Sequence, residues 1–330
     1  MKKKPNVLIF ADFPNWAYYE IQQFIKKNLN DDYEIFCDYL IFNSLRKSKN
    51  PIKRIKLLYK RIKYQNISNN NNYDIVLYLG FYFDELMKIK WKSKKVIKGI
   101  YTDSFPPKNA NFTGNLDGFI NRFLTNCDAI VCGSKQIKNN YKDIFQNTYY
   151  ANTILDENLF KRKTEKLINN NSIFTIGWTG NPNREFKGLQ SHIIPAIKIA
   201  KEKYPNIVFK TRYSGSIKTL PNFYTDIDVI VIASDADAGP SLFGEASLME
   251  VPAISTDIGW PHEVIKNNIN GITVKKNIVD IANNIIYLYE NRDLLHRMSK
   301  QIRIDYLKVF DKNKMVNHWK KMFSEVLKSN

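Results

Sequence analysis

Short apolar segments alternate with helical patterns along almost the whole chain, and this alternation constrains the fold more than any other feature. The apolar segments are rich in Val, Ile, Phe and Tyr, which favours β-strands, and the stretches between them have amphipathic helical spacing. Such an alternation predicts parallel sheets with helices on both faces, the α/β class. We expect strands at Asn6–Ala11, Tyr33–Phe42, Tyr73–Gly80, Val96–Tyr101, Ala129–Cys132, Ile173–Trp178, Ile207–Tyr213, Val229–Ala233, Ala253–Thr256 and Gly271–Val274. Helices are expected at about 16–29, 51–64, 82–90, 115–126, 135–145, 189–203, 243–250, 277–290, 293–308 and 312–328.

The length of the chain indicates two domains. Its 330 residues are more than one ordinary domain needs and fit two of about 150 residues each. The polar, Asn-rich stretch Lys161–Ser172 separates two similar strand–helix series and has the composition of a linker. We therefore expect one α/β domain over 1–165, a second from 166 onward, and a ligand cleft between them at the carboxyl ends of the strands.

Several classes of protein are disfavoured by what the sequence lacks. The three cysteines show no metal-ligand or disulfide spacing, which favours a reducing cytoplasm. The four histidines show no metal-binding motif, so neither a zinc enzyme nor a hydrolase triad is supported. No segment approaches the ~20 apolar residues of a membrane-spanning helix. We expect a cytoplasmic protein that is soluble or attached to a membrane surface.

The charge of the chain is strongly positive and uneven. The formal net charge is +18, and residues 1–170 hold 29 Lys/Arg against 16 Asp/Glu. A basic half of this kind favours an anionic partner, such as nucleic acid, acidic lipid or a phosphorylated substrate. A lysine-rich coding style explains the same surplus without any partner, and the composition does not separate the two.

One segment concentrates the positive charge. Leu45–Tyr64, here called the basic segment, contains nine Lys/Arg. Its apolar residues recur at helical spacing and form one stripe; they are Ile52, Ile55, Tyr59 and Ile62. Such a stripe can be the core face of a helix. Because the polar face is almost wholly cationic, the segment also fits a helix that lies on acidic lipid.

The most informative stretch begins at a buried strand that ends at Ser234. Two carboxylates follow, Asp237 in a Gly/Pro loop and Glu245 inside the next helix. The residues between them would place backbone N–H groups at the helix N-terminus, where a diphosphate can bind; they are Ser241, Leu242 and Phe243. A carboxylate one to two turns inside such a helix can accept hydrogen bonds from a ribose diol.

These residues carry a family resemblance. The run from Ser234 to Gly271 resembles retaining GT-B glycosyltransferases of the family-4 kind, in which a Glu-x7-Glu pair precedes a Gly-Val-Pro-Val strand and a Gly-Pro-Glu loop. This chain has Asp237-x7-Glu245, Val251-Pro252 and Gly259-Trp-Pro-His-Glu263. The upstream segment Gly180-Asn-Pro-Asn-Arg184-Glu-Phe-Lys187-Gly188 is similar to the family's phosphate loop. The resemblance also covers Cys127–Ser134 and Ala151–Phe160.

The resemblance implies a fold and a set of roles. The fold is GT-B, two Rossmann-like doubly wound domains facing a cleft: an acceptor domain over 1–165 and a donor domain over 166–311, with the C-terminal helix 312–330 packing back on the first. Glu245 would bind the donor ribose, Asp237 would act near the sugar hydroxyls, and Lys187 would neutralise the diphosphate. The other implied donor-binding residues are Gly180, Arg184, Ser241, Leu242, Phe243 and Glu263.

The chain departs from the family at three places. The first acid of the pair is Asp237 instead of Glu, and Asn181 occupies the position of the phosphate arginine, for which Arg184 can substitute. The Gly-Gly loop after the first strand is replaced by Asp12-Phe-Pro-Asn-Trp16.

The resemblance also implies residues that line the cleft. Where the family often has a His-Asp pair, this chain has Thr102-Asp103, so Asp103 is a candidate catalytic residue, although it can equally cap a turn. Asp12 and Trp16 are expected to line the cleft from the first domain. Trp260 is expected to contact the donor or to pack in the core.

The predicted function is hexosyl transfer from a nucleotide-sugar donor to a glycan or lipid-linked acceptor, with retention and without a metal or another cofactor. By analogy we expect a role in bacterial surface polysaccharide, capsule or lipopolysaccharide synthesis. The basic segment would attach the enzyme peripherally to the inner face of the plasma membrane. A GT-B epimerase or phosphorylase is the alternative enzyme, but it needs further acid–base, phosphate or pyridoxal groups that the sequence does not display. A basic nucleic-acid-binding protein is the alternative from another class, and no recognition module supports it.

Overall fold

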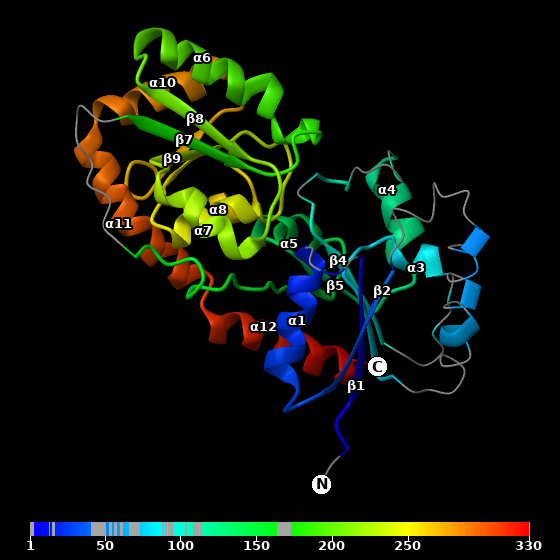
Figure 1. The fold of residues 1–330 in the computed structure, drawn as a ribbon. Helices are drawn as coiled ribbons and strands as arrows, with labels where there is room; N and C mark the ends of the chain where they lie inside the picture. The colour runs from blue at the N-terminus through cyan, green and yellow to red at the C-terminus, as the bar shows by residue number, and fades with distance from the viewer. Residues whose placement is uncertain are drawn as a thin grey trace. The chain divides into compact units, whose positions relative to one another are not determined.

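The chain divides into two units, which a computed structural model describes separately (Figure 1). Unit 1 comprises Met1–Ile154 and Lys312–Asn330, and unit 2 comprises Leu155–Asp311. The residues that the structure describes are 3–12, 14, 17–40, 51–52, 55, 58–59, 62–65, 73–87, 89, 91, 95–102, 104–107, 112, 114–163 and 173–329.

Unit 1 contains a parallel sheet in the order β2-β1-β3-β4-β5-β6. The strands are β1 (Asn6–Ala11), β2 (Glu34–Tyr39), β3 (Ile75–Tyr78), β4 (Lys95–Ile100), β5 (Ala129–Cys132) and β6 (Thr148–Tyr150). The central strands are buried on both faces, which explains why their sequences are apolar without alternation. The three-residue β6 adds an edge strand that the sequence pattern does not predict.

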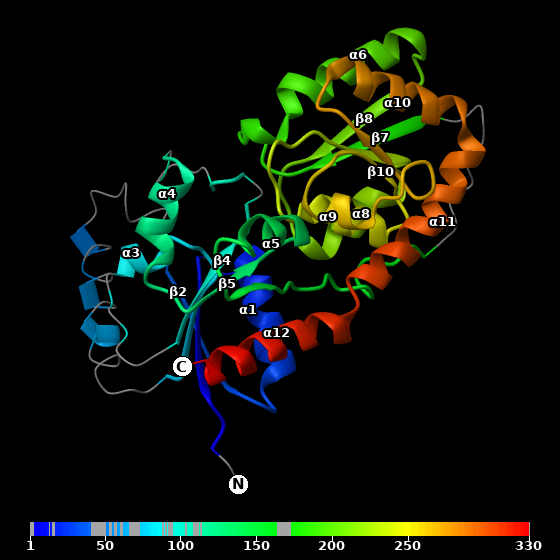
Figure 2. The same cartoon turned by 180° about the vertical axis from the view of Figure 1, so that it is seen from behind.

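The described part of unit 1 also contains helices, most of which connect these strands. They are α1 (Ala17–Leu29), α3 (Phe83–Met87), α4 (Leu116–Phe119), a π-helical turn at Ile120–Leu124, α5 (Lys135–Tyr141) and α12 (Lys312–Lys328). The C-terminal helix α12 packs beside α1 (Figure 2). The Trp319 indole donates to the Asn152 carbonyl at 2.8 Å, and the Lys320 ammonium lies 2.6 Å from the Asp32 carboxylate. These contacts make α12 part of unit 1 although unit 2 separates it from β6 in the sequence.

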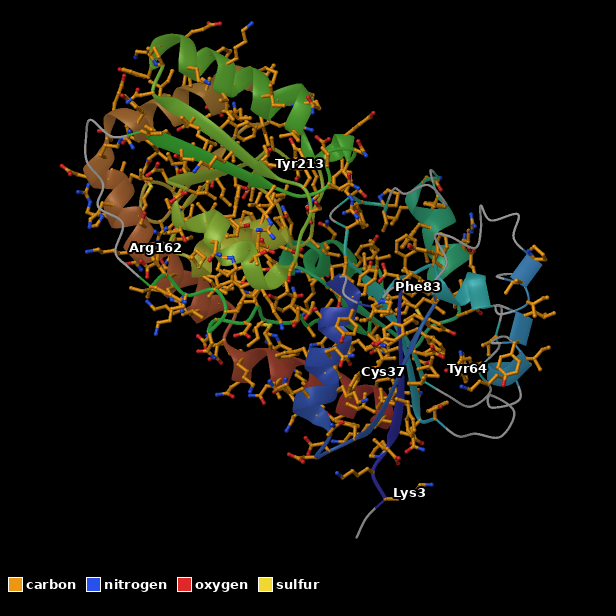
Figure 3. The ribbon with its side chains drawn as sticks, viewed as in Figure 1. Lys3, Cys37, Tyr64, Phe83, Arg162 and Tyr213 are labelled. Carbon is orange, nitrogen blue, oxygen red and sulfur yellow. The ribbon has the colours of Figure 1, made fainter. Side chains whose placement is uncertain are left out.

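Aromatic side chains dominate one part of the core of unit 1. Phe10 stacks on Tyr78 at a centroid distance of 5.1 Å and meets the edge of Tyr64 at 5.2 Å. The buried ring of Phe83 joins the same cluster (Figure 3). The hydroxyl of Tyr64 donates to the Asp38 carboxylate at 2.5 Å, so the polar end of this ring is satisfied.

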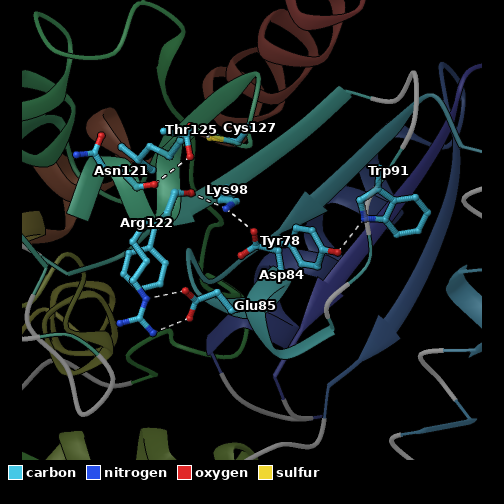
Figure 4. A network of polar contacts seen from close by, with 11 residues as sticks. Tyr78, Asp84, Glu85, Trp91, Lys98, Asn121, Arg122, Thr125 and Cys127 are labelled. Carbon is cyan, nitrogen blue, oxygen red and sulfur yellow. Dashed lines mark hydrogen bonds and ion pairs between the residues drawn. The ribbon is translucent and has the colours of Figure 1, made fainter. Parts of the chain in front are cut away.

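A buried lysine ties two connecting segments to the sheet of unit 1. The side chain of Lys98, on β4, is 1% exposed, and its ammonium donates to the Asp84 carboxylate at 2.5 Å (Figure 4). The same ammonium donates to the Phe123 carbonyl at 2.5 Å. Lys98 thus joins α3 and the π-helical turn to β4, and a charge this deeply buried requires both partners.

Unit 2 contains a second parallel sheet, in the order β11-β10-β9-β7-β8. The strands are β7 (Phe174–Thr179), β8 (Ile207–Arg212), β9 (Val229–Ile232), β10 (Ala253–Thr256) and β11 (Ile272–Val274). Because β7 lies between β8 and β9, the chain reverses direction across the sheet at this strand. Such a switch point places loops from neighbouring strands together at the carboxyl edge.

Helices cover both faces of this second sheet. They are α6 (Ile194–Lys203), α7 (Leu220–Thr225), α8 (Ser241–Leu248), α9 (Gly259–Val264), α10 (Ile278–Glu290) and α11 (Arg292–Val309). In Figures 1 and 2, α6 and α10 lie on one face and α8 on the other. The prediction of two Rossmann-like α/β sheets is confirmed. The predicted loop Gly259–Glu263 is a short helix instead, and Pro261 is compatible with its first turn because an N–H there has no partner within the helix.

The division between the units lies earlier in the sequence than residue 165. The guanidinium of Arg162 donates to the carbonyls of Met249, Thr225 and Tyr224, which all belong to unit 2. The segment 161–172, which its polar composition marks as a linker, therefore contains a residue, Arg162, that is anchored to unit 2. The helices whose bounds and placement fix the candidate site are all in unit 2.

Candidate functional site

The candidate site lies where β7 and β9 end. After β7, a loop leads through Gly180 to a 3₁₀ turn, Glu185–Lys187, and after β9 a loop leads through Asp237 to α8. The two loops are fitted together at Gly188, whose φ of +69° is left-handed and whose missing Cβ would lie 2.4 Å from the Ala233 carbonyl oxygen. Only glycine allows this approach, and it places Lys187 beside the loop that follows β9.

Lys187 and Asp237 meet in an ion pair. The Lys187 ammonium donates to the Asp237 carboxylate at 2.8 Å, and the two side chains are 18% and 16% exposed. The two residues are 50 positions apart in the sequence, and the fold brings them together. Their expected partners, the diphosphate and the sugar hydroxyls, are adjacent parts of one donor molecule. A partly buried ammonium in this position can also attract a diphosphate.

Glu245 is the most deeply buried acid of the site. It lies on the second turn of α8, is 7% exposed, and accepts a hydrogen bond from the Tyr224 hydroxyl at 2.6 Å. Burial raises the pKa of Glu245 to about 7, against the hydrogen bond from Tyr224 and the positive charges of Arg212 and Lys187, which lower it. Perturbed acids that face specific charged partners are typical of functional sites.

Two further residues of this cluster, Tyr224 and Arg212, belong to no motif in the sequence. Tyr224 is fully buried at the end of α7, and its hydroxyl also lies 3.3 Å from the Thr179 hydroxyl. The Arg212 guanidinium, at the end of β8, donates to the Ser216 and Thr219 carbonyls at 2.9 and 3.0 Å. The one signal for Arg212 was a charged residue at the end of a predicted strand, whereas Tyr224 lies in a helix that the pattern does not predict.

The start of α8 differs in detail from the prediction. Phe243 is fully buried, its ring packs against Tyr306, and its N–H donates to the Pro240 carbonyl at 2.8 Å. A phosphate would have to compete with that hydrogen bond for the Phe243 amide. Leu242 is buried and Ser241 is exposed. Ser241 is thus the accessible side chain of this turn.

Trp260 is a packing residue of unit 2. It is 5% exposed, its ring lies 4.9 Å from that of Phe310, and its indole fills the space that a Cβ on Gly239 would need. The backbone N–H of Trp260 donates to the Ala238 carbonyl at 3.1 Å. The start of α9 therefore fixes the loop that carries Asp237. Glu263, three residues further along α9, is half-buried.

The remaining predicted residues are spread over both units. Gly180 has a φ of +143°, and Arg184 is exposed, both within the loop that precedes Lys187. Asp12 directly follows β1 in unit 1 and is half-buried. Trp16 and Asp103 lie outside the described residues, as do most basic side chains of the basic segment.

Neither a metal site nor a membrane span is found in the part of the chain that the structure describes. No three His, Cys, Asp or Glu side chains among the described residues are grouped to hold a metal ion. No described helix combines the length and apolar character needed to cross a membrane.

Comparison with known protein families finds one match, within unit 2. Residues 197–305, which include Asp237 and Glu245, match the family described as glycosyl transferases group 1. No curated protein matches the sequence.

Solved structures with the same fold are numerous, at low sequence identity. HepE from Anabaena, solved with UDP and glucose, is 12% identical, with a TM-score of 0.70 over 97% of this chain and 100% of HepE. Sucrose-phosphate synthase from Thermosynechococcus elongatus is 10% identical, with a TM-score of 0.72 over 98% and 99% of the two chains. TarM from S. aureus, solved with UDP, is 16% identical, with a TM-score of 0.62 over 76% of this chain. This chain covers 55% of TarM. The chain therefore has the GT-B fold, and its second unit carries the sequence match to glycosyl transferases group 1.

Proposed function

We propose that this protein transfers a sugar from a nucleotide-sugar donor, with retention and without a metal or another cofactor. The observation that carries the proposal is the convergence of Lys187, Asp237 and Glu245 at one edge of the unit 2 sheet. Two of these residues lie in the segment that matches glycosyl transferases group 1. HepE and TarM, which share the fold, were solved with UDP.

The roles follow from the chemistry of each side chain. The Glu245 carboxylate is an acceptor for the two ribose hydroxyls of a donor. Lys187 and the N-terminus of α8 would stabilise the negative charge that develops on the leaving nucleoside diphosphate. Asp237, which pairs with Lys187 in the free protein, would orient sugar hydroxyls next to the diphosphate. In this arrangement the ammonium exchanges one anionic partner for another as the donor binds.

A nucleotide screen tests this proposal. In thermal unfolding experiments with UDP, GDP, CMP, dTDP and ADP, we expect at least one nucleotide to stabilise the protein. At 100 times its dissociation constant the gain is about 2.7 kcal/mol. Lys187→Ala should reduce the gain from a diphosphate, whereas Lys198→Ala, which changes an exposed lysine of α6, should leave it intact. Wild-type protein that none of the nucleotides or their sugars stabilises contradicts the proposed function.

We further propose that the acceptor is a glycan or glycolipid of the bacterial surface and that the basic segment attaches the enzyme to the inner face of the plasma membrane. The segment contains nine Lys/Arg and no Asp or Glu. The four apolar residues of the stripe are 54–69% exposed, and the neighbouring Leu58 is 55% exposed; the four are Ile52, Ile55, Tyr59 and Ile62. Exposed apolar side chains at helical spacing among cations are what an acidic lipid surface binds.

Vesicle flotation tests the membrane attachment. The wild-type protein should float with vesicles that contain phosphatidylglycerol and remain unbound with pure phosphatidylcholine. Changing Lys53, Arg54, Lys60 and Arg61 to Glu should abolish flotation, because each lost cation near the surface weakens binding by about 1 kcal/mol. The matched control changes four exposed lysines of unit 2 to Glu: Lys198, Lys201, Lys218 and Lys300. Equal flotation of both variants contradicts the attachment.

A further inference from the structure

A chain of hydroxyl groups ends on the buried acid of the site. The Tyr224 hydroxyl donates to Oε2 of Glu245 at 2.6 Å, and the Thr179 hydroxyl lies 3.3 Å from the Tyr224 oxygen. A phenol that donates its single proton to a carboxylate can only accept from a second hydroxyl, so the order of donation runs from Thr179 to Tyr224 to Glu245. Three segments thus converge on one carboxylate: the end of β7, the end of α7 and the second turn of α8.

Few other groups act on this carboxylate. Among the described residues, the titratable and charged groups that interact with Glu245 are Tyr224, Arg212 from β8, Lys187 from the 3₁₀ turn, and Tyr306 from α11. Arg212 is held by three acceptors of the 216–219 turn. Lys187 is paired with Asp237 at 2.8 Å. Of these four groups, Tyr224 is the one that donates a hydrogen bond to Glu245.

We propose that Tyr224 is a positioning residue, which favours the ionised form of Glu245 and orients it so that the carboxylate accepts the 2′- and 3′-hydroxyls of a ribonucleoside diphosphate donor. This inference rests on the proposed function and adds to it a determinant of selectivity. The bond to Tyr224 occupies one lone pair of Oε2 and removes the rotational freedom of the carboxylate. Three acceptor positions of the carboxylate remain for the two hydroxyls of a ribose. A 2′-deoxyribose lacks the 2′-hydroxyl and can donate only one of these hydrogen bonds.

The network also makes donor binding depend on pH. A protonated Glu245 offers fewer acceptor positions, and its proton must be displaced before two hydroxyls can donate. Because burial raises the pKa of Glu245 to about 7, affinity should rise between pH 6 and pH 8. The hydrogen bond from Tyr224 lowers that pKa, so its removal should move the midpoint to higher pH.

Calorimetric titration over pH 5.5–8.5 tests the inference with UDP-glucose and GDP-mannose, whose phosphates do not titrate in this range. For whichever sugar nucleotide binds, Tyr224→Phe should lower the affinity about 10-fold at pH 7 and raise the midpoint by about one pH unit, since hydrogen bonds to charged groups have this strength. The preference for the ribonucleoside diphosphate over its 2′-deoxy form should shrink in the same variant.

The matched control is Tyr204→Phe. The Tyr204 hydroxyl also donates to a carboxylate, that of Glu290, but it precedes β8 and so lies at the opposite end of the strands, more than about 15 Å away along the sheet. The Tyr204→Phe variant should bind the sugar nucleotide with the same affinity as the wild type, and the pH midpoint of binding should also be unchanged. Thr179→Val removes the outer hydroxyl and should shift the midpoint in the same direction as Tyr224→Phe, by less, with the ring of Tyr224 kept in place.

The outcomes separate the two proposals. Wild-type protein that binds no nucleotide or sugar nucleotide at any pH overturns the proposed function. Wild-type protein that binds, together with Tyr224→Phe and Thr179→Val variants whose midpoints are unchanged, overturns the positioning role and leaves the proposed function standing.

Discussion

Replacement of Glu245 by alanine is expected to lower the affinity for a nucleoside diphosphate at least about 100-fold, because two hydrogen bonds from the ribose to a charged acceptor are lost, each worth about 1.5–3 kcal/mol. Glu245 is 7% exposed, so solvent replaces the lost acceptor poorly. Isothermal titration calorimetry with the nucleotide that gives the largest thermal stabilisation measures the effect. A variant that binds within threefold of the wild type contradicts the role of Glu245.

The isosteric variant Glu245→Gln separates loss of function from loss of fold. Its shape is retained and it removes a buried acid, so its thermal stability should equal or exceed that of the wild type while the nucleotide affinity falls. The pKa of about 7 in the folded wild type lies above the usual value of 4.5. The protonated Glu245 therefore contributes stability that is complete below pH 4.5 and is lost as the pH rises through 7. The stability of Glu245→Gln relative to the wild type should therefore increase between pH 5 and pH 8.

Replacement of Lys98 by methionine is expected to destabilise unit 1 by about 3–5 kcal/mol, at the lower end of that range because Asp84 retains 20% exposure. The change leaves the Asp84 carboxylate and the Phe123 carbonyl without the ammonium that both accept from. Hydrogen–deuterium exchange of the β4 amides reports the local free energy of opening, and the amides of β7 and β9 in unit 2 provide an internal reference.

Two controls belong with the Lys98 variant. Arg122→Met breaks the neighbouring ion pair between Arg122 and Glu85, whose two side chains are 46% and 32% exposed. This variant should change the free energy of opening of the β4 amides by no more than about 1 kcal/mol. The double variant Lys98→Met with Asp84→Leu replaces the buried pair by apolar side chains and should recover most of the loss. Equal effects of Lys98→Met and Arg122→Met would contradict a special role for the buried pair.

The strands were predictable because each sheet is parallel and buried on both faces. Asn6–Ala11, Ala129–Cys132 and Ala253–Thr256 coincide with the predicted strands, since a short apolar run between turn residues has few alternatives in an α/β chain. The short elements were not predictable. The helices α7 and α9 have six residues each, too few for a periodic signal, and β6 has three.

The candidate site was predictable in its residues and not in their contacts. Lys187, Asp237 and Glu245 follow from a motif, but the ion pair between the first two depends on how the loops after β7 and β9 fit together at Gly188. Tyr224 carries no signal in the sequence, because a buried tyrosine that donates to a buried carboxylate has the same pattern as one that fills a core. Asp103 and Trp16 stay predictions.

The central claim is that a nucleotide-sugar donor binds at the carboxyl edge of the unit 2 sheet. A crystal structure of the full chain with the nucleoside diphosphate that stabilises it most tests this directly. We expect the ribose hydroxyls at about 2.5–3.2 Å from the Glu245 carboxylate and a phosphate oxygen at a similar distance from the Lys187 ammonium. A nucleotide bound in unit 1, or in unit 2 without contact to either Glu245 or Lys187, would contradict the account.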